Sequence, residues 1–170
     1  RGTFVNDQSS QELAARYSSI RGENGERVGE EVELLNVSEA VATDMECARL
    51  RLSSQENVHR IRRLRLSDGK PFMLEDVAMP AKVFAGLSQS TAPSYQIVIL
   101  AQQHGVLLGK GKERITTGSA SAEVADALRV EPSASILVLD RLIYTLDGTP
   151  VEWRLGYCNA AGKHYLAEIK

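Results

Sequence analysis

Two short turn sequences of the same kind most strongly limit what this chain can fold into. Asp-Gly-Lys-Pro at 68–71 follows an Arg-Leu pair at 63–64, and Asp-Gly-Thr-Pro at 147–150 follows an Arg-Leu pair at 141–142. An Asp-Gly step between two apolar runs indicates a hairpin, because both residues readily adopt positive φ. The two segments predict two hairpins of one design, although Asp-Gly turns are common enough for the likeness to arise by chance.

The residue pattern around these turns predicts an α+β fold. Strands are expected over 31–37, 58–66, 71–79, 112–117, 135–144 and 150–158, with a last strand over 164–169 closing the sheet. Helices are expected over 121–128 and in a short stretch at 11–17. A third is expected after a cap at Ser38, because Val41, Met45 and Ala48 have helical spacing. The segment 95–104 fits a helix or a buried strand, and its length and flanking Pro and Gly favour the helix. Hairpins with helices between them predict an antiparallel sheet with flanking helices.

The composition fits one soluble globular domain that does not grip DNA itself. At 170 residues, a chain buries about 70% of its unfolded surface. Two cysteines, Cys47 and Cys158, are too few for a disulfide framework and indicate a reduced, cytosolic setting. We expect no membrane span and no secretory signal. The net charge of −2 and the pI near 6.0 argue against direct DNA binding, because DNA-binding modules usually have a pI above about 9.

The motifs of common enzymes and metal sites are missing from the sequence. The glycines at 105, 109, 111 and 118 do not have phosphate-loop or dinucleotide spacing, and no serine lies in a Gly-x-Ser-x-Gly turn. His59, His104 and His164 have no metal-ligand partner at a recognised offset. Lys-Gly-Lys at 110–112 is interpreted as a solvated hairpin tip. We therefore expect no catalytic residue, no metal and no cofactor.

Arginines alternate along the strand expected over 58–66. Side chains of a strand point to alternate faces, so Arg63 and Arg65 share one face while Arg60 and Arg62 share the other. Two neighbouring guanidinium groups repel each other unless an anion or carboxylates lie between them. Guanidinium is also well suited to hold a carboxylate or a phosphate through two hydrogen bonds.

Two glutamates are placed to meet these arginines. Glu75 and Glu152 lie at even offsets from the prolines of their hairpins, so equivalent hairpins would put both on one side of the sheet. Two arginines and two glutamates around a cavity would suit a small ligand with an anionic group and hydrogen-bond donors. The alternative is that Arg63 and Glu75 form an ordinary cross-strand ion pair worth about 0.2–1 kcal/mol.

Several stretches, taken in order and spacing, resemble one family of bacterial regulators. Gly-Thr-Phe-Val at 2–5 resembles the end of the wing in the winged helix-turn-helix domain of GntR-type regulators. The chain from about residue 28 resembles the UTRA effector domain of the HutC-type branch. The matching stretches are 63–65, 68–71, Glu75 with 79–80, 128–130, 137–141 and 147–152. We divide the chain into a wing remnant at 1–5, a linker at 6–28 and an effector-binding domain at 29–170.

The resemblance implies a chorismate lyase-like fold that binds a small anionic metabolite instead of catalysing a reaction. It implies a cytoplasmic homodimer, without a membrane partner, that contacts DNA only through a missing N-terminal domain. Tyr-Cys-Asn at 157–159 departs from the Tyr-Arg-Gly-Asp-like residues of relatives, which indicates an effector other than the well-known phosphosugars. The positions that match ligand contacts of the family are Arg63, Arg65, Glu75, Glu152 and Tyr157, with Ser94 or Tyr95 at the start of the middle helix.

Two alternatives remain at this point. A shared fold makes a lyase acting on chorismate conceivable, but the wing remnant and the linker argue against a free-standing enzyme. The other alternative is a dimerisation module whose pocket no longer binds a ligand.

Overall fold

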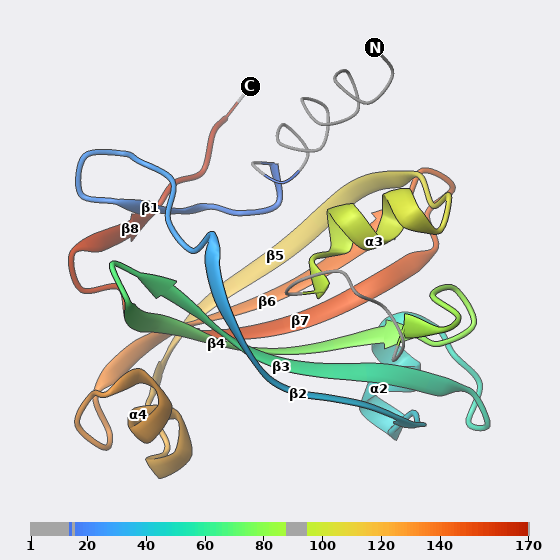
Figure 1. The fold of residues 1–170 in the computed structure, drawn as a ribbon, viewed down its shortest axis with the longest axis horizontal. Coiled ribbons are helices and arrows are strands. Elements are labelled where there is room, and N and C mark those ends of the chain that lie inside the picture. The colour runs from blue at the N-terminus through green and yellow to red at the C-terminus, as the bar shows by residue number, and fades with distance from the viewer. Residues whose placement is uncertain (1–13, 15, 88–94, 170) are drawn as a thin grey trace.

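A six-stranded antiparallel sheet is the main element of the computed structural model, which describes residues 14, 16–87 and 95–169. The strands are β1 (Ile20–Gly22), β2 (Glu31–Val41), β3 (Asn57–Ser67), β4 (Lys70–Pro80), β5 (Leu108–Ser119), β6 (Ser135–Thr145), β7 (Pro150–Cys158) and β8 (Lys163–Tyr165). The helices are α2 (Asp44–Leu50), α3 (Ile97–Gln103) and α4 (Ala122–Leu128). The sheet order is β2-β3-β4-β7-β6-β5, with β1 and β8 paired separately (Figure 1). The predicted α+β class, an antiparallel sheet with flanking helices, is confirmed.

The two predicted hairpins form the centre of the sheet. β3 and β4 are joined by Asp68 and Gly69, whose φ angles of 52° and 75° are both positive, as a tight two-residue turn requires. In the second hairpin Gly148, with φ of 88°, lies in the turn between β6 and β7. β4 and β7 pair in antiparallel fashion, so the hairpins meet along their second strands. The shared turn sequence therefore corresponds to two hairpins placed alike in one sheet.

Different helices cover the two faces of this sheet (Figure 1). On one face, Ile97 of α3 belongs to the same apolar cluster as Met79 of β4. On the other face, Leu50 of α2 packs with Ala78, and α4 packs against Leu74. Because successive strand residues alternate, odd-numbered positions of β4 face α3 and even-numbered ones face α2 and α4. We refer to these as the α3 face and the α2/α4 face.

The helix after β2 begins later than the sequence pattern predicts. Ser38 lies within β2 and does not cap a helix, so that prediction is wrong. Thr43 caps α2 instead, because its hydroxyl accepts a hydrogen bond from the Glu46 N–H while the Glu46 carboxylate accepts one from the Thr43 N–H. This reciprocal pair satisfies two N–H groups that have no partner within the helix. Val41 and Met45, whose spacing indicated a helix, are both exposed.

Two further expectations differ from the structure, and two agree. Lys-Gly-Lys at 110–112 lies inside β5 and is not a hairpin tip. The final strand is short and pairs with β1, with Ile20 opposite Tyr165, and does not close the main sheet. The segment 95–104 contains α3, so the helix was the correct choice. Ser121 caps α4 as predicted, since its hydroxyl accepts from the Val124 N–H.

Some expectations fall at or beyond the limits of the described residues. Of the short helix expected at 11–17, Ala14 and Arg16 are helical. The wing remnant at 1–5 and Ser94 lie outside the described residues. Within the described part of the chain, no helix is long and apolar enough to cross a membrane.

Candidate functional site

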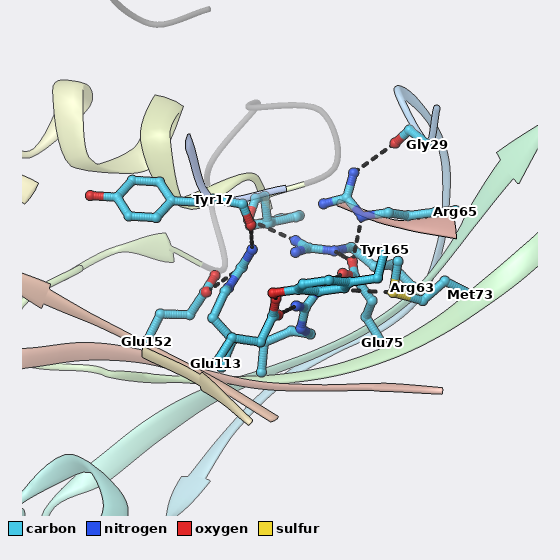
Figure 2. Close-up of polar contacts among 12 residues, drawn as sticks. Tyr17, Gly29, Arg63, Arg65, Met73, Glu75, Glu113, Glu152 and Tyr165 are labelled. Carbon is cyan, nitrogen blue, oxygen red and sulfur yellow. Dashed lines mark hydrogen bonds and ion pairs between the residues drawn. The ribbon is translucent and has the colours of Figure 1, made fainter. Parts of the chain in front are cut away.

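A cluster of charged side chains lies on the α3 face at the centre of the sheet (Figure 2). Charged residues are rarely fully buried unless they are paired, yet the side chains here range from fully buried to at most 18% exposed. The cluster draws on five neighbouring strands, β3 to β7. Its members are Arg63, Arg65, Glu75, Glu113, Arg141, Glu152 and Arg154.

Strand alternation and register bring these residues to one face. Arg63 lies directly opposite Glu75 in the β3–β4 pairing, and Arg65 is two residues further along β3 on the same face. Arg141 lies opposite Arg154 in the β6–β7 pairing and opposite Glu113 in the β5–β6 pairing. Residues paired across neighbouring strands point to the same side of a sheet, so one face collects the whole cluster.

Glu75 is the centre of the cluster. Its Oε1 accepts hydrogen bonds from Arg63 Nε at 2.6 Å and from Arg65 Nε at 2.8 Å. Its Oε2 accepts one from Arg154 Nη1 at 2.6 Å. Charge-assisted hydrogen bonds of this kind are roughly twice as strong as neutral ones. One buried carboxylate therefore fixes three guanidinium groups from two hairpins.

The remaining contacts tie the cluster to segments outside the main hairpins. Arg141 Nη2 donates to Glu152 Oε1 at 2.5 Å, and Arg141 Nη1 donates to the Tyr17 carbonyl at 2.7 Å. Glu113 accepts from Arg154 Nη2, and it also accepts from the Tyr165 hydroxyl at 2.7 Å. Tyr17 precedes β1 and Tyr165 belongs to β8, so the β1–β8 pair is anchored to the charged cluster.

The charges of the cluster do not balance. Four guanidinium groups face three carboxylates, which leaves one formal positive charge within the cluster. Burial alone would raise the pKa of Glu75, but the guanidinium groups of Arg65, Arg63 and Arg154 hold it well below its ordinary value. Burial lowers the pKa of Arg65 to about 10, against the opposing effect of Glu75. A further anion beside Arg65 would stabilise this guanidinium group.

Two hollows adjoin the cluster. The first, of about 60 Å³, is lined by Arg63, Arg65, Arg141, Tyr17 and residues of α3. The second, of about 360 Å³, is lined by Tyr17, Ser19, Glu113, Arg141 and Tyr165, together with residues 110–112 and Arg16. Small-molecule sites usually occupy about 300–1,000 Å³. The first hollow alone is too small for most metabolites, but Tyr17 and Arg141 line both hollows and mark where they adjoin.

Three buried side-chain atoms of the cluster have no hydrogen-bond partner among the described residues. They are Arg141 Nε, Arg154 Nε and Glu152 Oε2, and of these three residues Arg141 alone lines the two hollows. An unpaired buried polar group is unfavourable by about 1–3 kcal/mol. Arg141 Nε is therefore the candidate among them for a contact with a bound molecule.

A larger hollow of about 430 Å³ lies on the α2/α4 face. The arginines that line it already have carboxylate partners, since Arg60 bonds Glu46 and Arg62 bonds Asp76. Its remaining lining includes the apolar side chain of Leu155. Although this hollow is larger, it is a less favourable site for an anionic ligand than the α3 face is.

The structure brings together four of the predicted ligand contacts, Arg63, Arg65, Glu75 and Glu152. Tyr95 adjoins them through its main chain, because its carbonyl accepts a hydrogen bond from Arg63 Nη1 at 3.0 Å. The Tyr95 side chain packs in the apolar core.

Tyr157 is the predicted contact that the structure separates from the others. Tyr157 lies opposite Leu74 on the α2/α4 face, next to the apolar cluster that includes α4. Five residues separate it from Glu152, and an odd offset along a strand reverses the face. Cys158, one residue later, is fully buried on the α3 face instead.

Sequence reasoning missed three members of the cluster. Arg154 lies two residues after Glu152, so strand alternation alone places both on one face. Arg141 was noted only as part of the repeated hairpin sequence. Glu113 could not be found from its own strand, because its position depends on the β5–β6 register. Among the described residues, no group of three or more His, Cys, Asp or Glu side chains is arranged to hold a metal ion.

Comparison with known proteins shows the family of the chain. The profile of the UTRA domain matches residues 27–161. The chain is similar to the HTH-type transcriptional repressor NagR of Bacillus subtilis (strain 168), with 23% identity over 159 residues. The match covers 89% of this chain and 63% of NagR, so the chain spans less than two thirds of that relative's length.

Solved structures of similar shape include GntR-family regulators. A ligand-binding domain from Bordetella bronchiseptica assigned to that family has a TM-score of 0.82 and 27% identity, covering 91% of this chain and 98% of its own. A GntR-family regulator from Enterococcus faecalis V583 has a TM-score of 0.76 at 19% identity, covering 82% and 100%. PhnF from Mycobacterium smegmatis has a TM-score of 0.77 at 19% identity, covering 82% and 62%. The last two show the fold alone. Because the family profile matches most of its length, this chain belongs to the UTRA domain family.

Proposed function

We propose that this chain is the effector-sensing and dimerisation domain of a bacterial transcription regulator of the HutC-type branch of the GntR family. A small anionic metabolite would bind on the α3 face and change operator binding by an N-terminal winged helix-turn-helix domain. The regulator would act as a repressor in the cytoplasm, with two copies of this domain pairing two DNA-binding domains. No catalytic reaction is proposed, since the relatives described above are transcription regulators.

The observation that carries this proposal is the pair Arg63 and Arg65, held by the buried Glu75 beside a hollow. Both arginines line the first hollow, and Arg65 is the more exposed of the two at 18% of its side chain. Their orientation is fixed before any ligand arrives, because Glu75 bonds both Nε atoms. A preorganised site loses less conformational entropy on binding. The surplus positive charge supports an anion as the ligand.

Tyr17 connects this site with the N-terminal segment of the domain. It lines both hollows, and Arg141 holds its carbonyl in place. A metabolite larger than the first hollow would have to displace Tyr17 or extend past it. Tyr17 comes three residues before β1, on the side of the chain where a DNA-binding domain would be attached. A ligand that favours one position of this segment would shift the regulator between two states.

A thermal-shift screen of the 170-residue chain against organic acids and sugar phosphates tests the proposal. A ligand present at about 100 times its dissociation constant stabilises the folded state by about 2.7 kcal/mol, which is readily measured. We expect at least one anionic compound to raise the unfolding temperature, and Arg65→Met to abolish that shift.

Arg62→Met is the matched control. Arg62 lies on the same strand, but its side chain is on the α2/α4 face and bonds Asp76. The shift should persist in this variant. A screen without any hit, or a hit that both variants retain equally, would contradict the proposed site.

A further inference from the structure

We infer that the hollow on the α2/α4 face is a second binding site, which takes an uncharged, flat aromatic compound with one polar group. The hollow has a volume of about 430 Å³, within the range of about 300–1,000 Å³ that small-molecule sites usually occupy. It lies on the opposite side of the sheet from the charged cluster. The inference is therefore independent of the effector proposed above.

The strand register explains why this face is hollow at its centre. Residues paired across neighbouring strands share a face, and two adjacent rows across β3, β4 and β7 line the hollow. The rows are Arg60, Ala78 and Trp153, followed by Arg62, Asp76 and Leu155. Ala78 lies at the centre of the first row and is buried. Because its side chain is only a methyl group, the larger neighbours stand above it and leave a depression.

Ion pairs tie the arginines of both rows to their surroundings. Arg60 donates to Glu46 of α2 from Nε at 2.9 Å and from Nη2 at 2.7 Å. Arg62 donates to Asp76 from Nε at 2.8 Å, and its Nη1 lies 3.1 Å from Glu123 of α4. The two helices lie toward opposite ends of this face (Figure 1). The walls of the hollow are therefore held in place before a ligand arrives, which lowers the entropic cost of binding.

The charges that line this hollow balance. Its lining contains two guanidinium groups and two carboxylates, which belong to Arg60, Arg62, Glu46 and Asp76. The cluster on the α3 face has a surplus positive charge instead. A charged ligand on the α2/α4 face would leave an unmatched charge in a partly buried site, which is unfavourable. The hollow therefore favours a ligand without net charge.

The remaining lining suits a flat ring with one polar group. Trp153 and Leu155 are half-buried there, and aromatic rings stack favourably on one another. Ser38 lines the hollow from the neighbouring strand β2. Its hydroxyl and Arg60 Nη1 make no hydrogen bond to another described residue. A carbonyl oxygen, which has two lone pairs, can accept from both groups.

Trp153 makes occupancy of the hollow measurable, because it is the only tryptophan of the chain. Its fluorescence is followed in titrations with benzamide, benzoate and cyclohexanecarboxamide, which separate the effects of ring, charge and planarity. We expect benzamide to change the fluorescence saturably, with a dissociation constant on the order of 1 mM for so small a compound. Benzoate should bind at least about fivefold more weakly, because its charge is unmatched here. The non-planar cyclohexanecarboxamide should bind about threefold to tenfold more weakly.

Ser38→Phe assigns the binding to this hollow. Ser38 is exposed on the edge strand β2, where an aromatic residue is well tolerated, and the added ring would occupy the hollow. We expect this variant to bind benzamide at least about tenfold more weakly. Thr116→Phe is the matched control, because Thr116 is exposed on the other edge strand, on the same face but outside the hollow. Its response to benzamide should be unchanged, as should that of Arg65→Met.

Several results would overturn this inference. A benzamide response that is absent, or that persists in Ser38→Phe, would rule out the site. A response lost in Arg65→Met would show that benzamide binds on the α3 face instead. Binding of benzoate or cyclohexanecarboxamide as tight as that of benzamide would overturn the ligand class. Fluorescence that changes with protein concentration and not with benzamide would mean that a second copy of the chain covers the hollow.

Discussion

Arg63 and Glu75 face each other across β3 and β4, and Arg63 Nε donates to Glu75 Oε1 at 2.6 Å with neither residue exposed to solvent. The pair is more than a cross-strand contact, because Glu75 also holds Arg65 and Arg154. The two hairpins are thus joined by hydrogen bonds that one carboxylate accepts, as well as by the strand pairing of β4 and β7. The arrangement makes Glu75, and not any one arginine, the residue on which the cluster depends.

We predict that Glu75→Gln destabilises the domain more than Arg63→Met does. The glutamine removes the charged partner of three guanidinium groups, of which Arg154 keeps Glu113, and removing one partner of a buried ion pair lowers stability by about 3–5 kcal/mol. Arg63→Met leaves Glu75 with two arginines, so a smaller loss of about 1–3 kcal/mol is expected. Urea unfolding of both variants measures the difference. Equal losses, or the reverse order, would show that Glu75 is not the centre of the cluster.

Acid should remove the contribution of Glu75 to stability. The guanidinium groups hold its folded-state pKa well below the ordinary value, whereas in the unfolded chain a glutamate titrates near about 4.3. Between these two values the unfolded state binds more protons, so stability rises with pH there and is level above about pH 5. The stability difference between the natural chain and Glu75→Gln should therefore shrink when the pH falls from about 6 to about 3. A difference that stays constant across this range would contradict the assigned pKa shift.

The sequence predicts the place of a site residue where alternation along one strand decides it. It does not where the pairing of two strands decides it. Alternation within β3 correctly placed Arg63 and Arg65 together, and the repeated turns correctly oriented Glu75 and Glu152. The same rule, applied to β7, would have separated Tyr157 from Glu152. Pairing between strands that are distant in the sequence cannot be predicted from a local pattern, because it depends on which strand edges meet in the folded sheet.

The fold shows the same division between local and distant information. The hairpins, α4 and the helical nature of α3 follow from turn residues, caps and length, all of which act within a few residues. The short β8 strand pairs with β1 across most of the chain, and no local signal placed it outside the main sheet. The helix cap was misplaced because Ser38 is itself a favourable cap residue. Its place in β2 is decided by pairing with β3.

The position of the α2 cap can be tested with two alanine variants. Thr43→Ala removes the hydroxyl that accepts the Glu46 N–H, so we expect a loss of about 1 kcal/mol in unfolding free energy. Ser38→Ala is the matched control, because Ser38 lies in β2 away from the helix end. Its effect should stay within about 0.5 kcal/mol. A larger loss for Ser38→Ala than for Thr43→Ala would restore the cap expected from the sequence.

The two cysteines should differ sharply in reactivity. Cys158 is fully buried on the α3 face, and burial raises the pKa of its thiol to about 11. Cys47 is only half-buried, in the middle of α2. Because the thiolate is the reactive form, a disulfide reagent at about pH 8 should modify Cys47 in the folded protein and leave Cys158 intact.

Thiol counting before and after unfolding measures this difference. The folded chain should give one reactive thiol, and the chain in guanidinium chloride should give both of its two cysteines. Cys47→Ser should give none until it unfolds, so its labelling rate then reports the opening of the sheet around β7. Rapid labelling of the folded Cys47→Ser variant would mean that Cys158 is accessible to the reagent, and its buried position on the α3 face would be wrong.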